Sequence, residues 1–311
     1  MRPLASEQLR GVWATLLLPL HPDDTIDFGR LEDQVDFLVG AGLHGLYAHG
    51  TAGEFQTLSE AEFDQINELL AKACRAAGLP FQLGASHPSA QVMLDRVRRA
   101  AGLEPSAIQV ILPDWLPLND DEVLAFLTRA AATPVPLVLY NPPHAKTMVG
   151  PELLGRLADA VPTLIGLKTA GGDRAWFEAV KQAAPGLSIF VPGHFLASMS
   201  PLGAHGSYSN VAALSPAGAV RWYDQIHSDG GYAAAMDVER RIGVFFAGHI
   251  APLQAAGLSN PALDKFLAAV GGWADAGTRV RWPMSFATEA QVDAARPAAR
   301  ELLPELFLPD W

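Results

Sequence analysis

Eight short apolar segments alternate with helical patterns over the first two thirds of the chain, and this alternation constrains the fold more than any other feature. The apolar segments begin at Val12, Gly45, Phe81, Ala107, Leu137, Leu164, Ser188 and Gly206. Most are continuous apolar runs, which are typical of parallel strands buried on both faces. The helical patterns between them include 31–39, 59–77, 90–101, 121–131, 151–160 and 173–184. This order predicts an α/β protein with a (β/α)8 TIM barrel, with an open doubly wound sheet as the alternative.

The pattern changes after the eighth segment. No convincing strand follows Asn210, and the stretches 233–256, 260–270 and 288–302 have helical patterns. A barrel of this type takes about 250 residues, so the 311 residues of the chain leave room for an appendage. We therefore expect a barrel domain at 1–228 and a C-terminal helical region at 229–311.

The composition of the chain indicates which kind of molecule the protein binds. The chain has 22 Lys and Arg against 33 Asp and Glu, a net charge of −11, which argues against a nucleic-acid or anionic-membrane surface. A small-molecule partner is expected instead. Apolar runs are all well short of the ~18 residues of a membrane span, and the start lacks the apolar core of a signal peptide. The single cysteine, Cys74, cannot form an internal disulfide. These features predict a cytoplasmic protein.

The sequence offers little support for a cofactor or a metal. The segment GAGLHG at 40–45 matches the dinucleotide pattern G-x-G-x-x-G, but it closes a predicted helix and enters a strand. That context is the reverse of the nucleotide-binding one, so a helix cap and turn is the better interpretation. The nine histidines are scattered. We expect neither a cofactor nor a metal site.

The placement of the five lysines is more informative. Lys72, Lys181 and Lys265 lie in predicted helices, where solvated faces are expected, and Lys146 lies in a loop. Lys168 ends the apolar strand LIGLKT, at the mouth where barrel enzymes carry their chemistry. Burial there lowers the pKa of an amine, and the free amine can attack a carbonyl. A lysine paired with a carboxylate inside the barrel is the alternative, and position alone leaves both open.

Two neighbouring motifs favour the nucleophile. Tyr140 ends the preceding predicted strand, so its hydroxyl is expected beside the amine of Lys168, where a phenol can move the protons of imine formation. The second predicted strand runs into the turn GTAGE at 50–54, whose small residues let backbone N–H groups approach an anion. The carboxylate of a 2-keto acid fits such a turn, which is otherwise a tight strand–helix connection.

Taken in order, GTAGE at 50–54, LYNPP at 139–143 and GLKTAGGD at 166–173 resemble the dihydrodipicolinate synthase and N-acetylneuraminate lyase family. The resemblance extends from GVWAT at 11–15 to RWPM at 281–284. It implies a class I aldolase barrel, usually a homotetramer, whose lysine forms a Schiff base with pyruvate or another 2-keto acid without a cofactor. It places the Schiff-base lysine at Lys168, the tyrosine at Tyr140 and a catalytic hydroxyl at Thr51. It also implies substrate-binding positions at Gly50, Thr51, Ala52, Gly193 and Tyr208.

Three segments depart from the family pattern. PDW at 113–115 replaces a common Pro-Tyr-Tyr motif, whose second tyrosine reaches the neighbouring subunit, so we expect Trp115 at a subunit interface. PHAK at 143–146 lacks the arginine that synthases use for the second substrate, and Lys146 matches it only with a one-residue shift. GHF at 193–195 replaces an acidic Gly-Asp-Asp. These changes argue against lysine biosynthesis proper.

The resulting prediction is a Schiff-base-forming lyase that makes or breaks a carbon–carbon bond of a 2-keto acid. One alternative is a dehydratase of 2-keto-3-deoxy acids, which needs the same imine. Another is a barrel that binds keto acids without turnover, although simple binding needs neither Lys168 nor Tyr140. Trp115, Phe195 and Tyr208 indicate an aromatic-lined pocket, so a bulky aldehyde acceptor is a third option. A homo-oligomer is expected.

Overall fold

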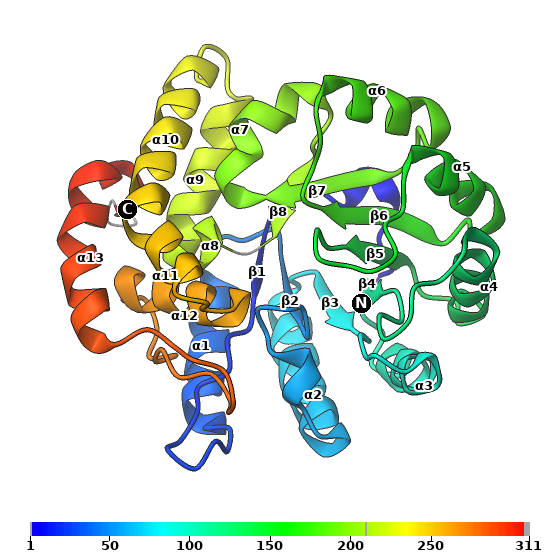
Figure 1. Ribbon diagram of the computed structural model, residues 1–311, viewed down its shortest axis with the longest axis horizontal. Coiled ribbons are helices and arrows are strands. Elements are labelled where there is room, and N and C mark those ends of the chain that lie inside the picture. The colour runs from blue at the N-terminus through cyan, green and yellow to red at the C-terminus, as the bar shows by residue number, and fades with distance from the viewer. Residues whose placement is uncertain (1, 209, 308–311) are drawn as a thin grey trace.

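A closed barrel of eight parallel strands forms the centre of the molecule in the computed structural model, which describes residues 2–208 and 210–307 (Figure 1). The strands are β1 (Gly11–Thr15), β2 (Gly45–Ala48), β3 (Phe81–Gly84), β4 (Ala107–Ile111), β5 (Leu137–Asn141), β6 (Leu164–Thr169), β7 (Ser188–Pro192) and β8 (Gly206–Tyr208). Each strand pairs with the next one along the chain, and β8 closes the barrel on β1. The predicted TIM barrel is confirmed, and the open sheet is excluded.

Helices surround the barrel and continue beyond it. The helices up to the end of the barrel are α1 (Phe28–Gly40), α2 (Glu60–Ala77), α3 (Ala90–Ala101), α4 (Asp120–Ala130), α5 (Pro151–Ala160), α6 (Arg174–Ala183), α7 (Leu196–Met199), α8 (Val211–Leu214) and α9 (Pro216–His227). The C-terminal helices are α10 (Tyr232–Phe245), α11 (Ala251–Ala255), α12 (Asn260–Gly271) and α13 (Glu289–Leu302). Single turns of 3-10 helix are η1 (Ser6–Gln8), η2 (Phe55–Thr57), η3 (Gly193–Phe195), η4 (Ser200–Leu202) and η6 (Pro304–Phe307), and η5 (Phe246–Ile250) is a π-helix.

Local sequence signals explain where these helices start. Ser59 with Glu62 forms a capping box at α2, and Asn119 with Glu122 does the same at α4. In each case the first side chain accepts from a free helix N–H, and the second reaches back to the cap residue. Gly78 ends α2 at φ 68°, a left-handed conformation that suits a residue without a side chain.

Two separate groups of buried side chains fill the protein. The larger lies between the strands and the surrounding helices. The smaller fills the barrel and consists of Leu9, Trp13, Tyr47, Ala107, Val138, Ile165, Phe190 and Tyr208. The barrel is therefore a packed core closed by aromatic rings, as in other barrels of this type, and its chemistry is confined to the mouth.

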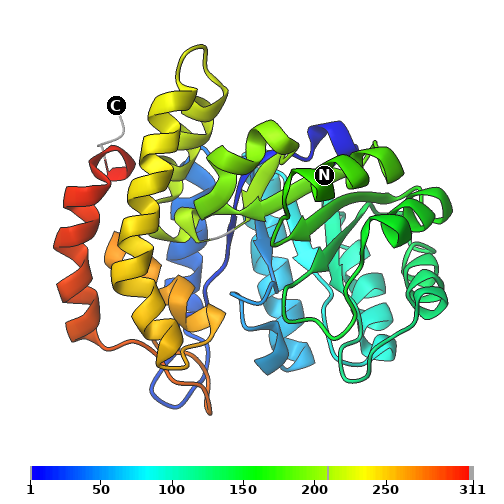
Figure 2. The ribbon, with the colours of Figure 1, turned by 45° about the horizontal axis from the view of Figure 1, so that its top comes forward.

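The C-terminal helices pack on one side of the barrel. In Figures 1 and 2, α10 and α13 lie on the side away from α4 and α5. Most of α12 is buried, and it contacts both α8 and α13. The predicted helix at 233–256 is present as α10, η5 and α11 in succession. Residues 228–231 connect α9 to α10, and the division into two domains there stays a prediction.

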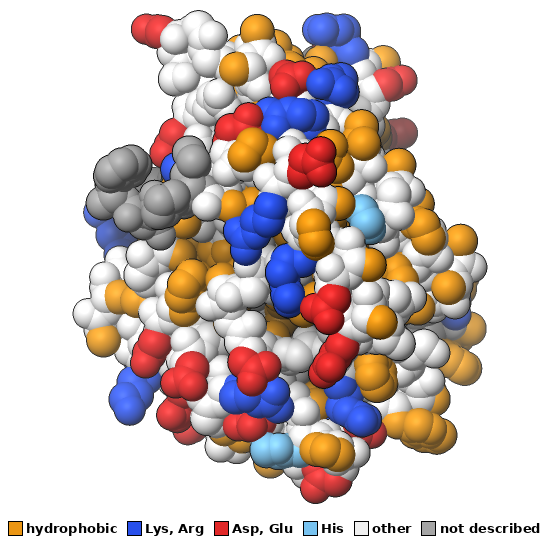
Figure 3. Space-filling view, turned by 90° about the vertical axis from the view of Figure 1, so that its left-hand side faces the viewer, with side chains coloured by type: hydrophobic (Ala, Val, Ile, Leu, Met, Phe, Trp, Pro, Cys, Tyr) orange, Lys and Arg blue, Asp and Glu red, His pale blue; other side chains and the backbone are white. Residues whose placement is uncertain are grey.

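Charged side chains of both signs are present on the surface, as the composition leads us to expect. On the face formed by α10 and α13, basic and acidic side chains are interspersed (Figure 3). Among the helices of the described residues, none has the length and apolar character that crossing a bilayer requires.

Candidate active site

The Lys168 amine lies among three tyrosine rings at the barrel mouth. The register of β5 and β6 pairs Tyr140 with Lys168, which brings the two predicted residues side by side. Lys168 Nζ lies 4.1 Å from the centroid of the Tyr140 ring, 5.0 Å from that of Tyr47 and 5.2 Å from that of Tyr208. An amine enclosed by aromatic faces has lost much of its hydration while its charged form keeps a favourable interaction with the rings.

This environment sets the protonation states of the pair. Burial lowers the pKa of Lys168 to about 8, and the negative charge of Asp264 acts in the opposite direction. Burial raises the pKa of Tyr140, while a side-chain hydrogen bond with Thr51 lowers it. Near neutral pH the free amine is therefore a minor fraction, but a far larger one than in an ordinary lysine, and it lies next to a phenol that keeps its proton. Among the described residues Lys168 forms no ion pair. The alternative in which Lys168 is salt-bridged to a carboxylate inside the barrel is therefore not what the structure shows.

The turn at 50–54 approaches this amine closely. A Cβ on Gly50 would lie 3.7 Å from Lys168 Nζ and 2.7 Å from Tyr47 Cε2, so the absence of a side chain permits the approach. The N–H groups of Gly53 and Glu54 close the turn on Gly50 and Thr51 at 3.0 and 3.1 Å. Across the described part of the chain, the N–H groups of Thr51 and Ala52 donate to no protein acceptor. They are therefore available to an anion.

Three adjoining cavities lie at the barrel mouth, and Lys168 lines one of them. The lysine chamber, of about 300 Å³, is lined by Lys168, Tyr47, Ala52, Tyr140 and Tyr208, among others. The outer cavity, of about 520 Å³, extends from η3 to the C-terminal helices. A side cavity of about 220 Å³ is lined by Thr51 and Tyr140, among others. Gly193 lies just outside the chamber wall, which its neighbours Pro192 and His194 form.

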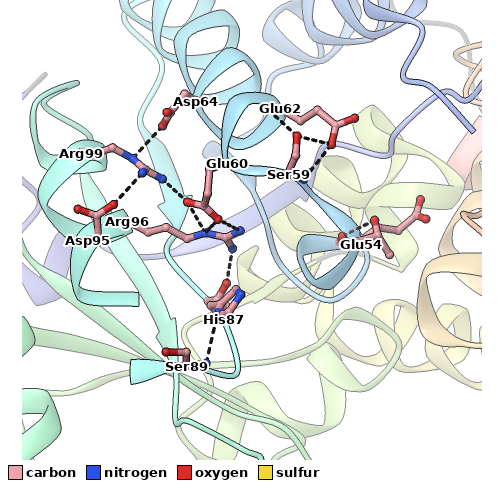
Figure 4. Close-up of polar contacts among 12 residues, drawn as sticks. Glu54, Ser59, Glu60, Glu62, Asp64, His87, Ser89, Asp95, Arg96 and Arg99 are labelled. Carbon is pink, nitrogen blue, oxygen red and sulfur yellow. Dashed lines mark hydrogen bonds and ion pairs between the residues drawn. The ribbon is translucent and has the colours of Figure 1, made fainter. Parts of the chain in front are cut away.

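A network of arginines and carboxylates anchors the start of α2, which follows the turn (Figure 4). Arg96 of α3 is fully buried and binds Glu60 at 2.7 Å, and it donates to the Ser86 carbonyl at 2.6 Å. Arg99 also pairs with Glu60 and contacts Asp64 at 3.1 Å. This arrangement ties α2 to α3 and to the loop after β3.

The prediction that Lys265 lies on a solvated face is wrong. Lys265 Nζ lies 2.5 Å from Glu54 Oε1, and both side chains are fully buried. The other carboxylate oxygen of Glu54 accepts from the Arg281 N–H at 2.9 Å, and Lys265 donates to the Arg279 carbonyl at 2.5 Å. The last residue of the GTAGE motif is therefore a structural link between the turn, α12 and the 279–281 segment.

The departures from the family pattern occupy different places around the mouth. Lys146 points away from the chamber, because its Nζ donates to the Trp115 carbonyl at 2.8 Å. His194 faces the chamber, and burial lowers its pKa to about 4, so the ring is neutral. Within one chain, Tyr208 lines the chamber, Phe195 lines the outer cavity, and Trp115 is 78% exposed.

Sequence reasoning missed Tyr47 and Asp264. Tyr47 lies inside β2, where an aromatic residue is indistinguishable from ordinary core, and Asp264 lies on the buried helix α12. Among the described residues no group of histidines, cysteines and acids is arranged to hold a metal ion.

Comparison with known proteins identifies the relatives of this site. The profile of the Dihydrodipicolinate synthetase family matches residues 8–299. The 4-hydroxy-tetrahydrodipicolinate synthase of Sorangium cellulosum is 30% identical over 214 residues, which cover 67% of this chain and 70% of that protein. An uncharacterized DapA-like lyase of Thermococcus onnurineus is 30% identical over 162 residues, 51% of this chain and only 54% of that relative. The solved 4-hydroxy-tetrahydrodipicolinate synthase of Methylacidiphilum fumariolicum SolV superposes with a TM-score of 0.84 at 19% identity, covering 96% of this chain and 98% of that one.

The fold and these matches define a (β/α)8-barrel lyase. The chain belongs to the dihydrodipicolinate synthetase family. The family resemblance seen in the sequence motifs is thereby confirmed, as is the prediction of a lyase.

Proposed function

We propose that the protein forms a Schiff base between Lys168 and pyruvate or another 2-keto acid, and then makes or breaks a carbon–carbon bond. The observation that carries this proposal is the half-buried amine of Lys168, which lies 4.1 Å from the Tyr140 ring centroid and whose pKa is lowered to about 8. A non-catalytic binding site would gain nothing from a desolvated nucleophile, because an anion is bound better by a permanently charged group.

The proposed reaction uses the residues of the chamber in sequence. The free Lys168 amine attacks the C2 carbonyl of the keto acid, and Tyr140 supplies the proton that the carbonyl oxygen takes. The resulting carbinolamine loses water to give a protonated imine. The imine withdraws electrons, so the Tyr140 phenolate takes a proton from C3 and an enamine forms. The enamine attacks an aldehyde carbon, and Tyr140 returns this proton to the aldehyde oxygen. Water then adds to the new imine, which releases the product and the Lys168 amine. Cleavage is the reverse sequence.

In this proposal the turn at 50–54 binds the carboxylate of the keto acid. We assign the carboxylate of the keto acid to the N–H groups of Thr51 and Ala52, which donate to no acceptor among the described residues. Thr51 also hydrogen-bonds to Tyr140, which suits it to relay protons with the phenol. We assign Tyr208 to the chamber wall, and Gly193 to support of that wall rather than direct contact.

We further propose a cytoplasmic homo-oligomer that acts on small molecules. Cys74 is a free buried thiol, and burial raises its pKa to about 12, so it is unreactive. That state suits a reducing compartment. The exposed Trp115 at the barrel mouth supports a subunit interface.

Replacement of Lys168 tests the proposed function. Incubation with pyruvate and borohydride should add one reduced pyruvate to the parent protein, at Lys168, as seen by mass spectrometry of its peptides. Lys168→Ala should give no adduct and no turnover while it keeps the parent circular dichroism spectrum. Lys146→Ala is the matched control, because this lysine also lies at the mouth but is bound to the Trp115 carbonyl. An adduct on the Lys168 variant, or on Lys146 in the parent, would disprove the assignment.

A further inference from the structure

His49 lies between β2 and the turn at 50–54, and its backbone conformation is unusual for a residue with a side chain. Its φ is 60°, in the left-handed region that is unfavourable for residues other than glycine. Such strain persists only where the surrounding structure holds it, and it is common at ligand sites. His49 is only 1% exposed, so neighbouring residues enclose it. The strained residue directly precedes the turn that binds the keto acid in the proposed function.

The left-handed backbone places the His49 side chain outside the barrel. In β2, Tyr47 belongs to the group that fills the barrel and Ala48 to the group outside it. Side chains of a strand alternate between its two faces, so a regular strand would point residue 49 into the mouth. The His49 ring instead stacks on Phe63 of α2, at a centroid distance of 4.6 Å and an interplanar angle of 30°. The ring therefore packs behind the turn and does not line the lysine chamber.

One hydrogen bond fixes the His49 ring in this position. Its Nε2 lies 2.8 Å from Oδ1 of Asn67, a side chain that is also only 1% exposed. Burial lowers the pKa of His49 to about 3, so the ring is neutral and donates from Nε2 to the amide oxygen. Phe63 and Asn67 are four residues apart on α2, so they lie on the same face of the helix. Stacking and hydrogen bonding therefore hold the ring together.

The elements on both sides of His49 are themselves fixed. The Arg96 guanidinium lies 4.6 Å from the centroid of the Phe63 ring, and it binds Glu60 at the start of α2 (Figure 4). On the side of β3, a Cβ on Gly84 would lie 2.4 Å from the His49 carbonyl oxygen, so only glycine there permits this close approach. The strained backbone of His49 is therefore held between α2 and β3.

We propose that His49 is a positioning residue for the keto acid. Its bond to Asn67 keeps the left-handed backbone that starts the turn, and this backbone directs the N–H groups that follow it. Those of Thr51 and Ala52 form an anion site only while the turn keeps its conformation. This inference rests on the proposed function, because it needs a keto acid held at Lys168. Without the ring contacts the backbone would relax, and the bound carboxylate would have to restore it. Affinity would then fall, while the reacting groups stay in place.

The test compares two substitutions of His49 in the borohydride trapping assay with pyruvate. His49→Ala leaves a residue that disfavours positive φ, whereas His49→Gly leaves one that suits it. We expect the half-saturating pyruvate concentration to rise about tenfold in His49→Ala and no more than about threefold in His49→Gly. The trapping rate at saturating pyruvate should stay within about twofold of the parent, as expected when only binding is lost. Loss of packing alone predicts the reverse order, because glycine removes more of the side chain than alanine.

Asn67→Ala tests the hydrogen bond while the His49 ring is still present. Alone, it should raise the half-saturating pyruvate concentration severalfold. Combined with His49→Gly, it should add little to the effect of that substitution, because glycine needs no bond to hold its backbone. This double-variant comparison decides the question if His49→Ala does not fold.

His205→Ala is the matched control. The His205 ring also forms a hydrogen bond, since it accepts from the Ile189 N–H at 3.0 Å, but it precedes β8 at the opposite end of the barrel. This variant should keep the parent half-saturation, and a rise equal to that of His49→Ala would overturn the inference. So would a His49→Gly variant that binds pyruvate as weakly as His49→Ala, or an Asn67→Ala variant with parent affinity. Absence of any pyruvate adduct in the parent would instead overturn the proposed function.

Discussion

At the residue scale, the proposed chemistry requires opposite protonation states of two neighbouring side chains, Lys168 and Tyr140. Lys168 must lose its proton to attack a carbonyl, whereas Tyr140 must keep its own to donate it. Burial favours the neutral form of both groups, because it lowers the pKa of the amine and raises that of the phenol. One dehydrated chamber therefore prepares a nucleophile and an acid together.

We expect the pH profile to distinguish these two roles. In the parent, the rate of adduct formation at low pyruvate should rise with pH as the amine is freed and level off above about pH 8, the lowered pKa of Lys168. Tyr140→Phe keeps the ring, so the midpoint should stay in place while the plateau falls ~10²–10⁴-fold, the usual loss for a positioned acid–base group. Rapid-mixing kinetics with mass detection measures both.

Tyr223→Phe removes a hydroxyl from α9, away from the chamber, and should reproduce the parent profile. An unchanged plateau in Tyr140→Phe would mean that Tyr140 only packs against Lys168 and that Thr51 or water carries the proton.

At the scale of elements, the pair of Glu54 and Lys265 joins the turn after β2 to α12. A buried ion pair of this kind is costly to break, because the remaining partner keeps its charge without compensation. Glu54→Gln should therefore lower the free energy of unfolding by about 3–5 kcal/mol, as measured by denaturant titration. The double variant Glu54→Gln with Lys265→Met should recover much of that loss, since neither charge remains.

The matched control for this pair is on the surface. Asp121→Asn removes the carboxylate that contacts Arg156 at 2.6 Å, where both side chains are exposed, and should change stability little. A Glu54→Gln variant as stable as the parent would show that the buried link contributes nothing to the fold.

The elements also show which parts of the site a sequence can specify. Parallel strands of a barrel end at one mouth, so the strand-end positions of Tyr140 and Lys168 alone predict that the two side chains are neighbours, as the register of β5 and β6 shows. The positions of Asp264 and Lys265 could not be predicted in this way, because α12 is buried on nearly all sides. The apolar pattern of such a helix does not reveal which side chain faces which neighbour. The place of Tyr47 beside Lys168 could not be predicted either, because both faces of a barrel strand are apolar.

At the scale of the whole molecule, an exposed apolar patch borders the mouth of the barrel. Trp115, Leu116 and Met148 are 78%, 69% and 55% exposed. Their two loops are tied together, because Leu118 donates its N–H to the Thr147 hydroxyl at 2.7 Å and Lys146 donates its N–H to Asp114 at 2.7 Å. A preformed surface with large apolar side chains is typical of a protein interface. Asp114 also lines the side cavity with Tyr140, so the patch is continuous with the proposed site.

We expect Trp115→Ala to weaken self-association and keto-acid binding together, because one side chain would serve both the subunit contact and the neighbouring site. Trp282→Ala is the matched control: Trp282 is 81% exposed but lies in the segment after α12, so its loss should affect neither property. Sedimentation velocity across a range of concentrations, combined with borohydride trapping on the same samples, measures both effects. If Trp115→Ala keeps the parent oligomer and the parent half-saturation for pyruvate, Trp115 belongs to neither surface. If only association weakens, the patch is an interface that leaves the chamber of each subunit complete on its own.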